Sequence, residues 1–136
     1  MSAETNAALG RLFFAEQDRL RGGPAEALCA PEYTAYIGGN PAIDLAGHQQ
    51  FAAMFYAAFP DMKHAVEDIV ATEDKVAVRF TLHGTQSGNF MGIPATGKTI
   101  AVTAIAILQI ADGKVTELRG IFDQLGMMQQ LGVLGA

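Results

Sequence analysis

The stretch from Lys98 to Leu131 constrains the fold more than any other part of the chain, because it encodes a hairpin that leads directly into a helix. Its first half, KTIAVTAIAILQI, places an apolar residue at every second position from Ile100 to Ile110, and the intervening positions are mostly apolar too. Such a segment is typical of a strand inside a sheet with both faces covered. Asp112-Gly113 provides turn residues, so the chain from Val115 onward is expected to return antiparallel.

The second half of this stretch, TELRGIFDQLGMMQQL, changes from strand to helix at Asp123. Leu125, Met128 and Leu131 then form one apolar stripe at helical spacing, and Gly132 suits the end of the helix. Asp is a favoured N-cap residue, but a carboxylate at this junction is also a candidate for acid–base chemistry. Both interpretations of Asp123 stay open at this point.

The strand before Asp123 is irregular. Val115 and Ile121 fall on odd positions, whereas Leu118 and Phe122 fall on even ones. A bulge near Gly120 would bring these apolar side chains onto one face. The position of that bulge decides which way the Asp123 side chain points.

Periodicity and breaker residues indicate the remaining elements. Helices are expected over residues 2–21, 24–29 and 47–59, and strands over 32–37, 64–71 and 76–84. In the first helix, Leu9, Leu12, Phe13 and Leu20 are expected to face inward and Gln17 to face solvent. The order predicts one α+β domain over residues 1–136, with helices gathered on one side of an antiparallel sheet.

The high share of apolar residues predicts a cavity or a partner surface. Half of the 136 residues are hydrophobic, which is high for a chain of this length. Helix 47–59 has an aromatic face, and the long Gly/Pro-rich segment 84–97 has apolar residues embedded in it, as functional flaps do. The expected ligand-binding residues for an apolar small molecule are Tyr33, Phe55, Phe59, Phe90 and Met91. A homodimer through the outer face of the sheet is the second expectation.

Charge and segment composition argue against several classes of partner. The net charge is −5 without a Lys/Arg cluster, so neither nucleic acid nor an anionic membrane surface is an expected partner. The longest apolar run is far shorter than the roughly 20 residues that a membrane span needs. Residues 1–21 do not have the pattern of a signal or transit peptide, so we expect a cytoplasmic protein.

Motifs for metals and nucleotides are weak. Residues 92–99, GIPATGKT, match the letters of a phosphate-binding loop, but a strand rather than a helix follows, and Pro94 removes a backbone donor. His48, His64 and His83 have no spacing that suggests a metal site, and His48 is expected to be solvated or locally bonded. Cys29, the single cysteine, is expected to be a small buried residue of the core. We expect neither a metal nor a cofactor.

Three segments carry a resemblance to a known family: FYAAFPD at the end of the third helix, the loop SGNFMGIPATGK, and the ending FDQLGMMQQLG. With these in order over nearly the whole chain, the sequence resembles the SnoaL-like polyketide cyclases of the nuclear transport factor 2-like superfamily. The resemblance implies a curved antiparallel sheet wrapped by three N-terminal helices and one C-terminal helix into a cone with a deep apolar pocket, commonly dimeric. It also implies ring closure by an aldol reaction without metal or cofactor.

The catalytic residues of the resembled cyclases carry over imperfectly. Their catalytic Asp falls on Gly120 or, with a shifted bulge, on Asp123, and their assisting His falls on Ala106. Two hypotheses follow. Either Asp123 is the acid–base residue of a polyketide or ester cyclase, with its pKa raised by an apolar pocket, or it only caps the last helix and the chain is a binding module for an apolar small molecule.

Overall fold

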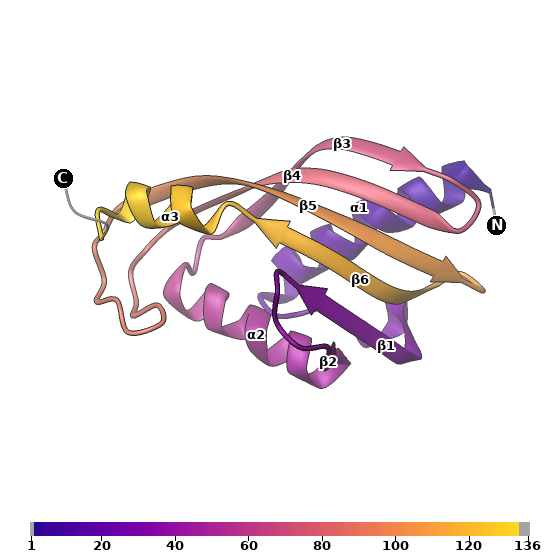
Figure 1. Ribbon diagram of the computed structural model, residues 1–136, viewed down its shortest axis with the longest axis horizontal. Coiled ribbons are helices and arrows are strands. Elements are labelled where there is room, and N and C mark those ends of the chain that lie inside the picture. Colours follow the sequence, from indigo (N-terminus) through magenta and orange to yellow (C-terminus); the bar gives the residue numbers. More distant parts are fainter. Residues whose placement is uncertain (1, 134–136) are drawn as a thin grey trace.

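The computed structural model describes residues 2–133, and the remaining residues of the predicted domain, 1 and 134–136, lie outside that range. The described chain forms the following elements, shown in Figure 1: α1 (Ala3–Leu20), the one-turn 3-10 helix η1 (Glu26–Leu28), β1 (Cys29–Ile37), β2 (Ile43–Asp44), α2 (Leu45–Ala58), β3 (Lys63–Ala71), β4 (Lys75–Thr85), β5 (Thr99–Ala111), β6 (Lys114–Phe122) and α3 (Gln124–Leu131). The predicted second helix over 24–29 is therefore a single turn.

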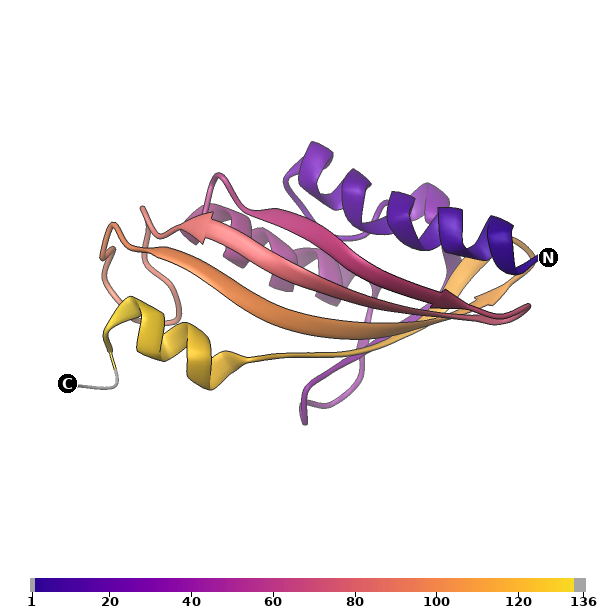
Figure 2. The same cartoon turned by 90° about the horizontal axis from the view of Figure 1, so that it is seen from above.

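The six strands form one curved sheet in the order β2-β1-β6-β5-β4-β3. Figure 2 shows that α1 and α2 lie on the side toward which the sheet bends, and that α3 lies on the other side. The α+β class and the curved sheet are confirmed, but the expectation that the helices gather on one side of the sheet is wrong for α3, and one strand direction differs from the antiparallel prediction. β1 runs parallel to β6, whereas every other neighbouring pair is antiparallel, so the sheet is mixed.

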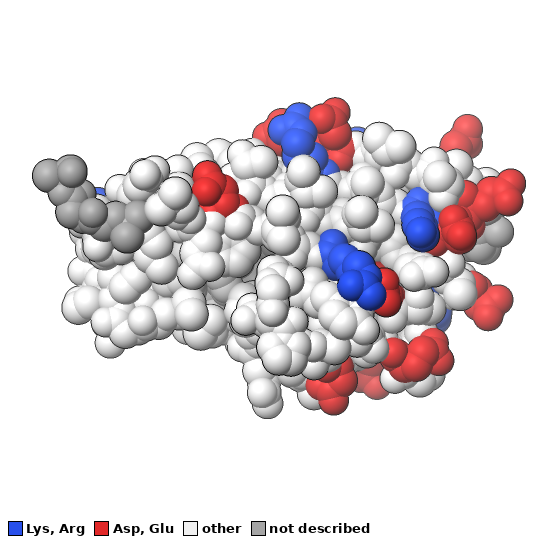
Figure 3. Space-filling model, viewed as in Figure 1, with Lys and Arg blue, Asp and Glu red and all other residues white. Residues whose placement is uncertain are grey.

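The predicted hairpin forms as β5 and β6, but only one face of β5 is covered. Its even positions from Ile100 to Ile110 are buried, and every odd position is exposed. Ile105 and Ile107 are 44% and 46% exposed, so the expectation that both faces are covered is wrong within a single chain. The outward face is the one seen in Figure 3, where most charged side chains gather toward the end of the molecule that carries the N-terminus.

The predicted bulge in β6 exists, but it lies at Thr116 and not near Gly120. Gln109 pairs with Glu117 and Ile110 pairs with Val115, so Thr116 is the extra residue. The Thr116 hydroxyl donates to the Gln109 carbonyl at 3.2 Å. Beyond the bulge the alternation is regular, and Gly120 faces inward across from Ala106.

Helix α1 packs with a different face from the one expected. The buried positions are Asn6, Gly10, Phe13, Phe14 and Gln17, whereas Leu12 and Leu20 are about half exposed. A Cβ at Gly10 would come within 2.9 Å of a methyl group of Val76, so this glycine lets the helix approach β4 closely. The two adjacent phenylalanines then fix the rotation of the helix, and Gln17 follows them into the interior. No helix within residues 2–133 is both long enough and apolar enough to cross a membrane.

Candidate functional site

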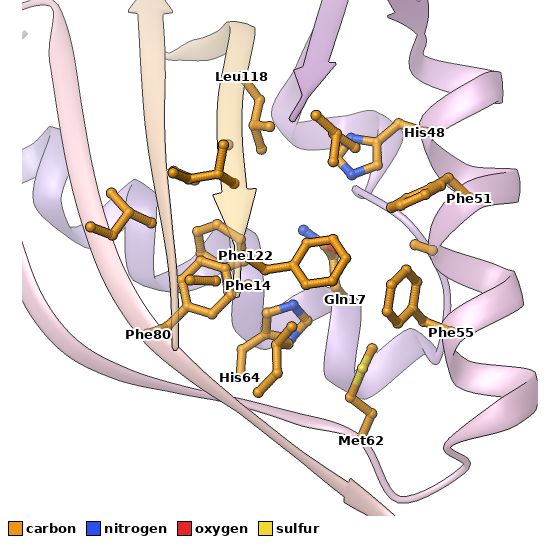
Figure 4. A pocket seen from close by; sticks show the side chains of 18 of the residues that line it. Phe14, Gln17, His48, Phe51, Phe55, Met62, His64, Phe80, Leu118 and Phe122 are labelled. Carbon is orange, nitrogen blue, oxygen red and sulfur yellow. The ribbon is translucent and has the colours of Figure 1, made fainter. Parts of the chain in front are cut away.

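A pocket lies between the concave face of the sheet and the helices α1 and α2. Its volume is about 90 Å³, close to that of three water molecules at roughly 30 Å³ each. Most of its lining is apolar or aromatic; the labelled apolar side chains in Figure 4 are Phe14, Phe51, Phe55, Met62, Phe80, Leu118 and Phe122. A predominantly apolar wall with few polar groups is the usual composition of a small-molecule site.

Polar side chains reach this pocket from α1, α2 and β3. Gln17 comes from α1, His48 and Tyr56 come from α2, and His64 comes from the start of β3. Figure 4 shows His48 and His64 on different sides of the pocket, with the Gln17 amide and the Phe122 ring between them in this view. The chemistry available to a bound molecule depends on which atoms of these groups are free.

His64 is paired with Asp18, which reaches it from α1. The His64 Nδ1 lies 2.7 Å from the Asp18 Oδ1, and the backbone N–H of His64 donates to the Asp18 Oδ2 at 2.8 Å. The Tyr56 hydroxyl also donates to the Asp18 Oδ1 at 2.7 Å. The two side chains of the pair are only 8% and 16% exposed, so this pair is shielded from bulk water.

The surroundings keep the Asp18 carboxylate ionised. Burial alone raises the pKa of a carboxyl, but the hydrogen bonds and charge of His64, together with the Tyr56 hydroxyl, outweigh it and hold the Asp18 pKa below its ordinary value. A carboxylate bonded to Nδ1 fixes the imidazole with its Nδ1 proton toward Asp18. The Nε2 of His64 then remains for a bound molecule, because this ring lines the pocket. A carboxylate–imidazole pair in this arrangement can accept and return a proton.

His48 has a different partner and a different protonation state. Its Nδ1 lies 2.7 Å from the hydroxyl of Tyr33, and the two rings are stacked at 5.9 Å. Burial lowers the pKa of His48 to about 4, so the ring is neutral at neutral pH, and burial raises the pKa of Tyr33. The prediction that His48 would be solvated or bonded locally is wrong, since its partner lies on β1 and the ring is 6% exposed. The His48 edge that lines the pocket can serve as a hydrogen-bonding group but not as a cation.

Asp123 is placed at the N-cap of α3. Its Oδ1 accepts a hydrogen bond from the backbone N–H of Gly126 at 2.9 Å, as a capping carboxylate does. The residue is exposed and is not among those that line the pocket. The expected burial of Asp123 among apolar side chains is therefore wrong, and its geometry is that of the cap.

Of the five residues predicted to bind a ligand, Phe55 lines the pocket. Phe59 and Phe90 are completely buried and pack against each other at 5.5 Å in the core beyond the pocket wall. Tyr33 reaches the pocket only through His48. Met91 is 60% exposed at the tip of the loop, because the loop folds around the buried Gln86 amide rather than closing over a cavity.

Two of the three positions onto which the resemblance carries polar residues face the pocket. Gly120 and Ala106 are direct partners in the β5–β6 ladder, and both belong to the lining, whereas the third, Asp123, does not. The β5–β6 wall of the pocket therefore has no polar side chain at these two positions. The polar groups of this chain come from α1, α2 and β3 instead.

Sequence reasoning missed Asp18, His64 and Gln17. Asp18 and His64 are 46 residues apart and form no motif, and Gln17 was assigned to the solvent face of its helix. The one available signal was the rotation of α1: an inward face centred on Phe13 and Phe14 carries Gln17 inward with it. Within residues 2–133, no group of three or more His, Cys, Asp or Glu side chains is arranged to hold a metal ion.

Comparisons with known proteins agree with this architecture. The model of the SnoaL-like polyketide cyclase family matches residues 12–131. Aklanonic acid methyl ester cyclase DnrD of Streptomyces peucetius is 36% identical over 98 residues, and the match covers 68% of this chain and 66% of DnrD, just under two thirds of that relative.

Two solved structures extend the comparison. IdmH of Streptomyces antibioticus, described as a candidate polyketide cyclase, is 32% identical with a TM-score of 0.76, over 96% of this chain and 97% of IdmH. AclR of Streptomyces galilaeus, described as a candidate hydroxylase, is 28% identical with a TM-score of 0.87, over 100% of this chain and 89% of AclR.

Proposed function

Since the chain belongs to the SnoaL-like polyketide cyclase family, we propose that it closes a ring in a polyketide-like ester by proton transfer without a cofactor, with His64 as the acid–base residue. The observation that carries this proposal is the Asp18–His64 pair at 2.7 Å, whose imidazole forms part of the wall of an otherwise apolar pocket. Asp123, the residue expected from sequence, has no comparable geometry.

The reaction that this pair supports is an intramolecular aldol closure. The Nε2 of His64 takes a proton from the carbon next to a carbonyl group, and the resulting enolate carbon bonds to a second carbonyl carbon of the same molecule. The second carbonyl becomes an alkoxide, which takes the proton back from His64. Atoms and electrons balance within one substrate, so the product is an isomer and no oxidant or reductant is consumed.

Asp18 assists this step as a positioning residue. It fixes the tautomer of His64 through Nδ1, and its negative charge stabilises the imidazolium that forms when Nε2 accepts a proton. Tyr56 and the His64 backbone N–H hold the carboxylate in place. Because the pair is shielded from water, its charge acts on the substrate more strongly than it would at the surface.

The apolar wall of the pocket matches the chemical character of such a substrate, but the pocket in this structure is too small to hold it. Aromatic side chains of α2 and β6 offer faces for a planar apolar molecule. A cavity of about 90 Å³ is smaller than the roughly 300 Å³ at the lower end of ligand pockets, so a polyketide must displace wall side chains as it enters. Phe51 and Phe122 are only partly buried and are the expected residues to move.

The test is ring closure of a cyclisable polyketide methyl ester, followed by chromatography and proton NMR of the product. His64→Gln keeps a polar side chain of similar size but removes the base, so we expect the rate to fall by roughly 10²- to 10⁴-fold. His83→Gln, the same change at an exposed residue of β4, is the matched control and should keep the wild-type rate. An unchanged rate in His64→Gln would refute the assignment.

The second candidate is a binding module without catalysis. It is favoured by Gly120 and Ala106, which leave the β5–β6 wall without a polar side chain. Uptake of planar apolar molecules by the wild-type protein, without turnover of any cyclisable ester, would support this alternative.

A further inference from the structure

The side-chain amide of Gln17 lies in the pocket without a protein partner. The residue is 3% exposed, and its Nε2 is fully buried and makes no hydrogen bond within residues 2–133. Buried amide donors are nearly always satisfied in folded proteins, by protein, by ordered water or by a ligand. Figure 4 shows the Gln17 side chain reaching the middle of the pocket between His48 and His64 in this view.

The other polar side chains of the wall differ from Gln17 in this respect. His64 is bonded to Asp18, His48 is bonded to Tyr33, and Tyr56 donates to Asp18. The fold therefore supplies partners for each of these groups and leaves the Gln17 amide for something else.

Asn6, a second residue of α1 with a buried unpartnered atom, differs from Gln17. Asn6 also has a buried atom without a partner, its Oδ1, but its Nδ2 donates to the Thr72 carbonyl at 3.0 Å and the residue lies outside the pocket. Asn6 thus ties α1 to the β3–β4 turn. Gln17 makes no such tie through its side chain, although it is the neighbour of Asp18 in sequence.

We propose that Gln17 binds the carbonyl oxygen of the substrate. Its unpartnered atom is a donor, so the ligand must present an acceptor, and the apolar wall requires that acceptor to be carried on an apolar body. A ketone or ester carbonyl on a planar ring system has this chemistry. The inference rests on the proposed function and deepens it. The carbonyl bound by Gln17 is the one next to the carbon that loses a proton, and its oxygen gains negative charge in the enolate.

Binding of matched probes tests this inference without any need for turnover. 1-Indanone carries a carbonyl, and indane is the same skeleton without it. We expect wild-type protein to bind 1-indanone about five- to tenfold more tightly than indane by ligand-observed NMR, the gain of one hydrogen bond. In Gln17→Met, which has a similar shape but no donor, that preference should vanish, while Gln129→Met, the same change at an exposed site on α3, should keep it.

Two further readouts separate a direct hydrogen bond from a change in fold. The carbonyl stretching band of bound 1-indanone should lie at lower wavenumber in the wild type than in Gln17→Met. Gln17→Met should melt at the wild-type temperature or above it, since it removes an unsatisfied buried donor.

The inference is overturned if Gln17→Met keeps the ketone preference, if the wild type binds indane as well as 1-indanone, or if the carbonyl band does not shift. A ketone preference that depends on Gln17, in a protein that cyclises no ester, would uphold this inference and refute the proposed function. Ring closure by a protein that shows no ketone preference would refute this inference and uphold the proposed function.

Discussion

His48 and His64 both line the pocket, but their environments give the two side chains different chemical roles. His64 is bonded to the Asp18 carboxylate, whereas His48 is buried against a phenol that carries no charge. His48 stays neutral because burial lowers its pKa, and it contributes a fixed dipole to the pocket, while His64 is the residue that we propose to take up the proton during a reaction. Residue type alone does not predict this division of tasks, because it depends on partners from other elements.

The pH dependence of stability should reveal the buried His48. Its pKa is about 4 in the folded protein and 6.5 in the unfolded chain, so between these values the unfolded state binds the proton and the folded state does not. Stability therefore falls as the pH drops from 6.5 to 4, by about 1.4 kcal/mol per pH unit and about 3 kcal/mol in total. Above pH 6.5 this residue causes no further change.

Urea unfolding at pH 7, 5.5 and 4 measures this loss, with His48→Phe as the variant that removes the titrating ring. We expect the variant to be less stable at pH 7, because Tyr33 loses its partner, but to lack the slope between pH 6.5 and 4. The Asp18 contribution lies at lower pH, since its lowered pKa makes stability decline only as the carboxyl protonates. An identical slope in the two proteins would show that His48 is not buried as neutral imidazole.

At the residue scale, the sequence predicted caps better than catalytic groups. Local sequence favoured Asp123 as a helix cap, and the structure shows that cap. The hydrogen bond to Gly126 joins residues only three apart, so a local pattern can predict it. The Asp18–His64 pair needs a helix and a strand that are 46 residues apart to meet, and no local pattern encodes that meeting.

At the scale of elements, β6 shows how a small irregularity decides where a site lies. The broken alternation of Val115 and Leu118 predicted a bulge, and the bulge is present, but its location was four residues off. With the extra residue at Thr116, Gly120 faces the pocket and the chain leaves the pocket wall before Asp123. A bulge changes the face of every later residue, so its position had to be known before any carboxylate could be assigned.

The elements with strong periodicity were predictable, and their pairing was not. The hairpin of β5 and β6, the alternating β4 and the aromatic helix α2 agree with their predictions. The parallel pairing of β1 with β6 joins segments from opposite ends of the chain, and the order in which distant strands meet leaves no trace in local composition. Tyr33 of β1 in turn contacts His48 of α2.

The outer face of β5 and β6 leads us to propose a homodimer. Ile105, Ile107 and Ile121 are 44%, 46% and 63% exposed, and a surface of this kind gains free energy when a second copy covers it. Light scattering at micromolar concentration should give twice the chain mass of 14.4 kDa.

Ile107→Lys tests that proposal by placing a charge in the predicted interface, and it should shift the protein to a monomer. Leu12→Lys, at a residue of α1 that is 46% exposed and lies away from the outer face of the sheet, is the matched control and should leave the mass unchanged. A monomeric wild type, or an Ile107→Lys variant that stays dimeric, would rule out this interface.

At the scale of the whole molecule, the curved sheet and the two helices on its concave face make one shielded site from distant segments. α1 brings Gln17 and Asp18, α2 brings His48 and Tyr56, and β3 brings His64. The β5–β6 wall supplies Ala106 and Gly120, which carry no polar side chain. The acid–base pair that we propose comes instead from α1 and from β3, an edge strand of the same sheet.

The most direct test of this account compares ring closure of a cyclisable polyketide methyl ester by Asp18→Asn and Asp123→Asn. Both variants remove one carboxylate and keep its shape, and circular dichroism checks that both fold. We predict that Asp18→Asn lowers kcat by roughly 100-fold or more, because His64 loses the charge and tautomer that make it a base, while Asp123→Asn stays within about twofold of wild type, since Asn caps a helix nearly as well as Asp. The opposite pattern, with activity lost in Asp123→Asn and kept in Asp18→Asn, would contradict the account.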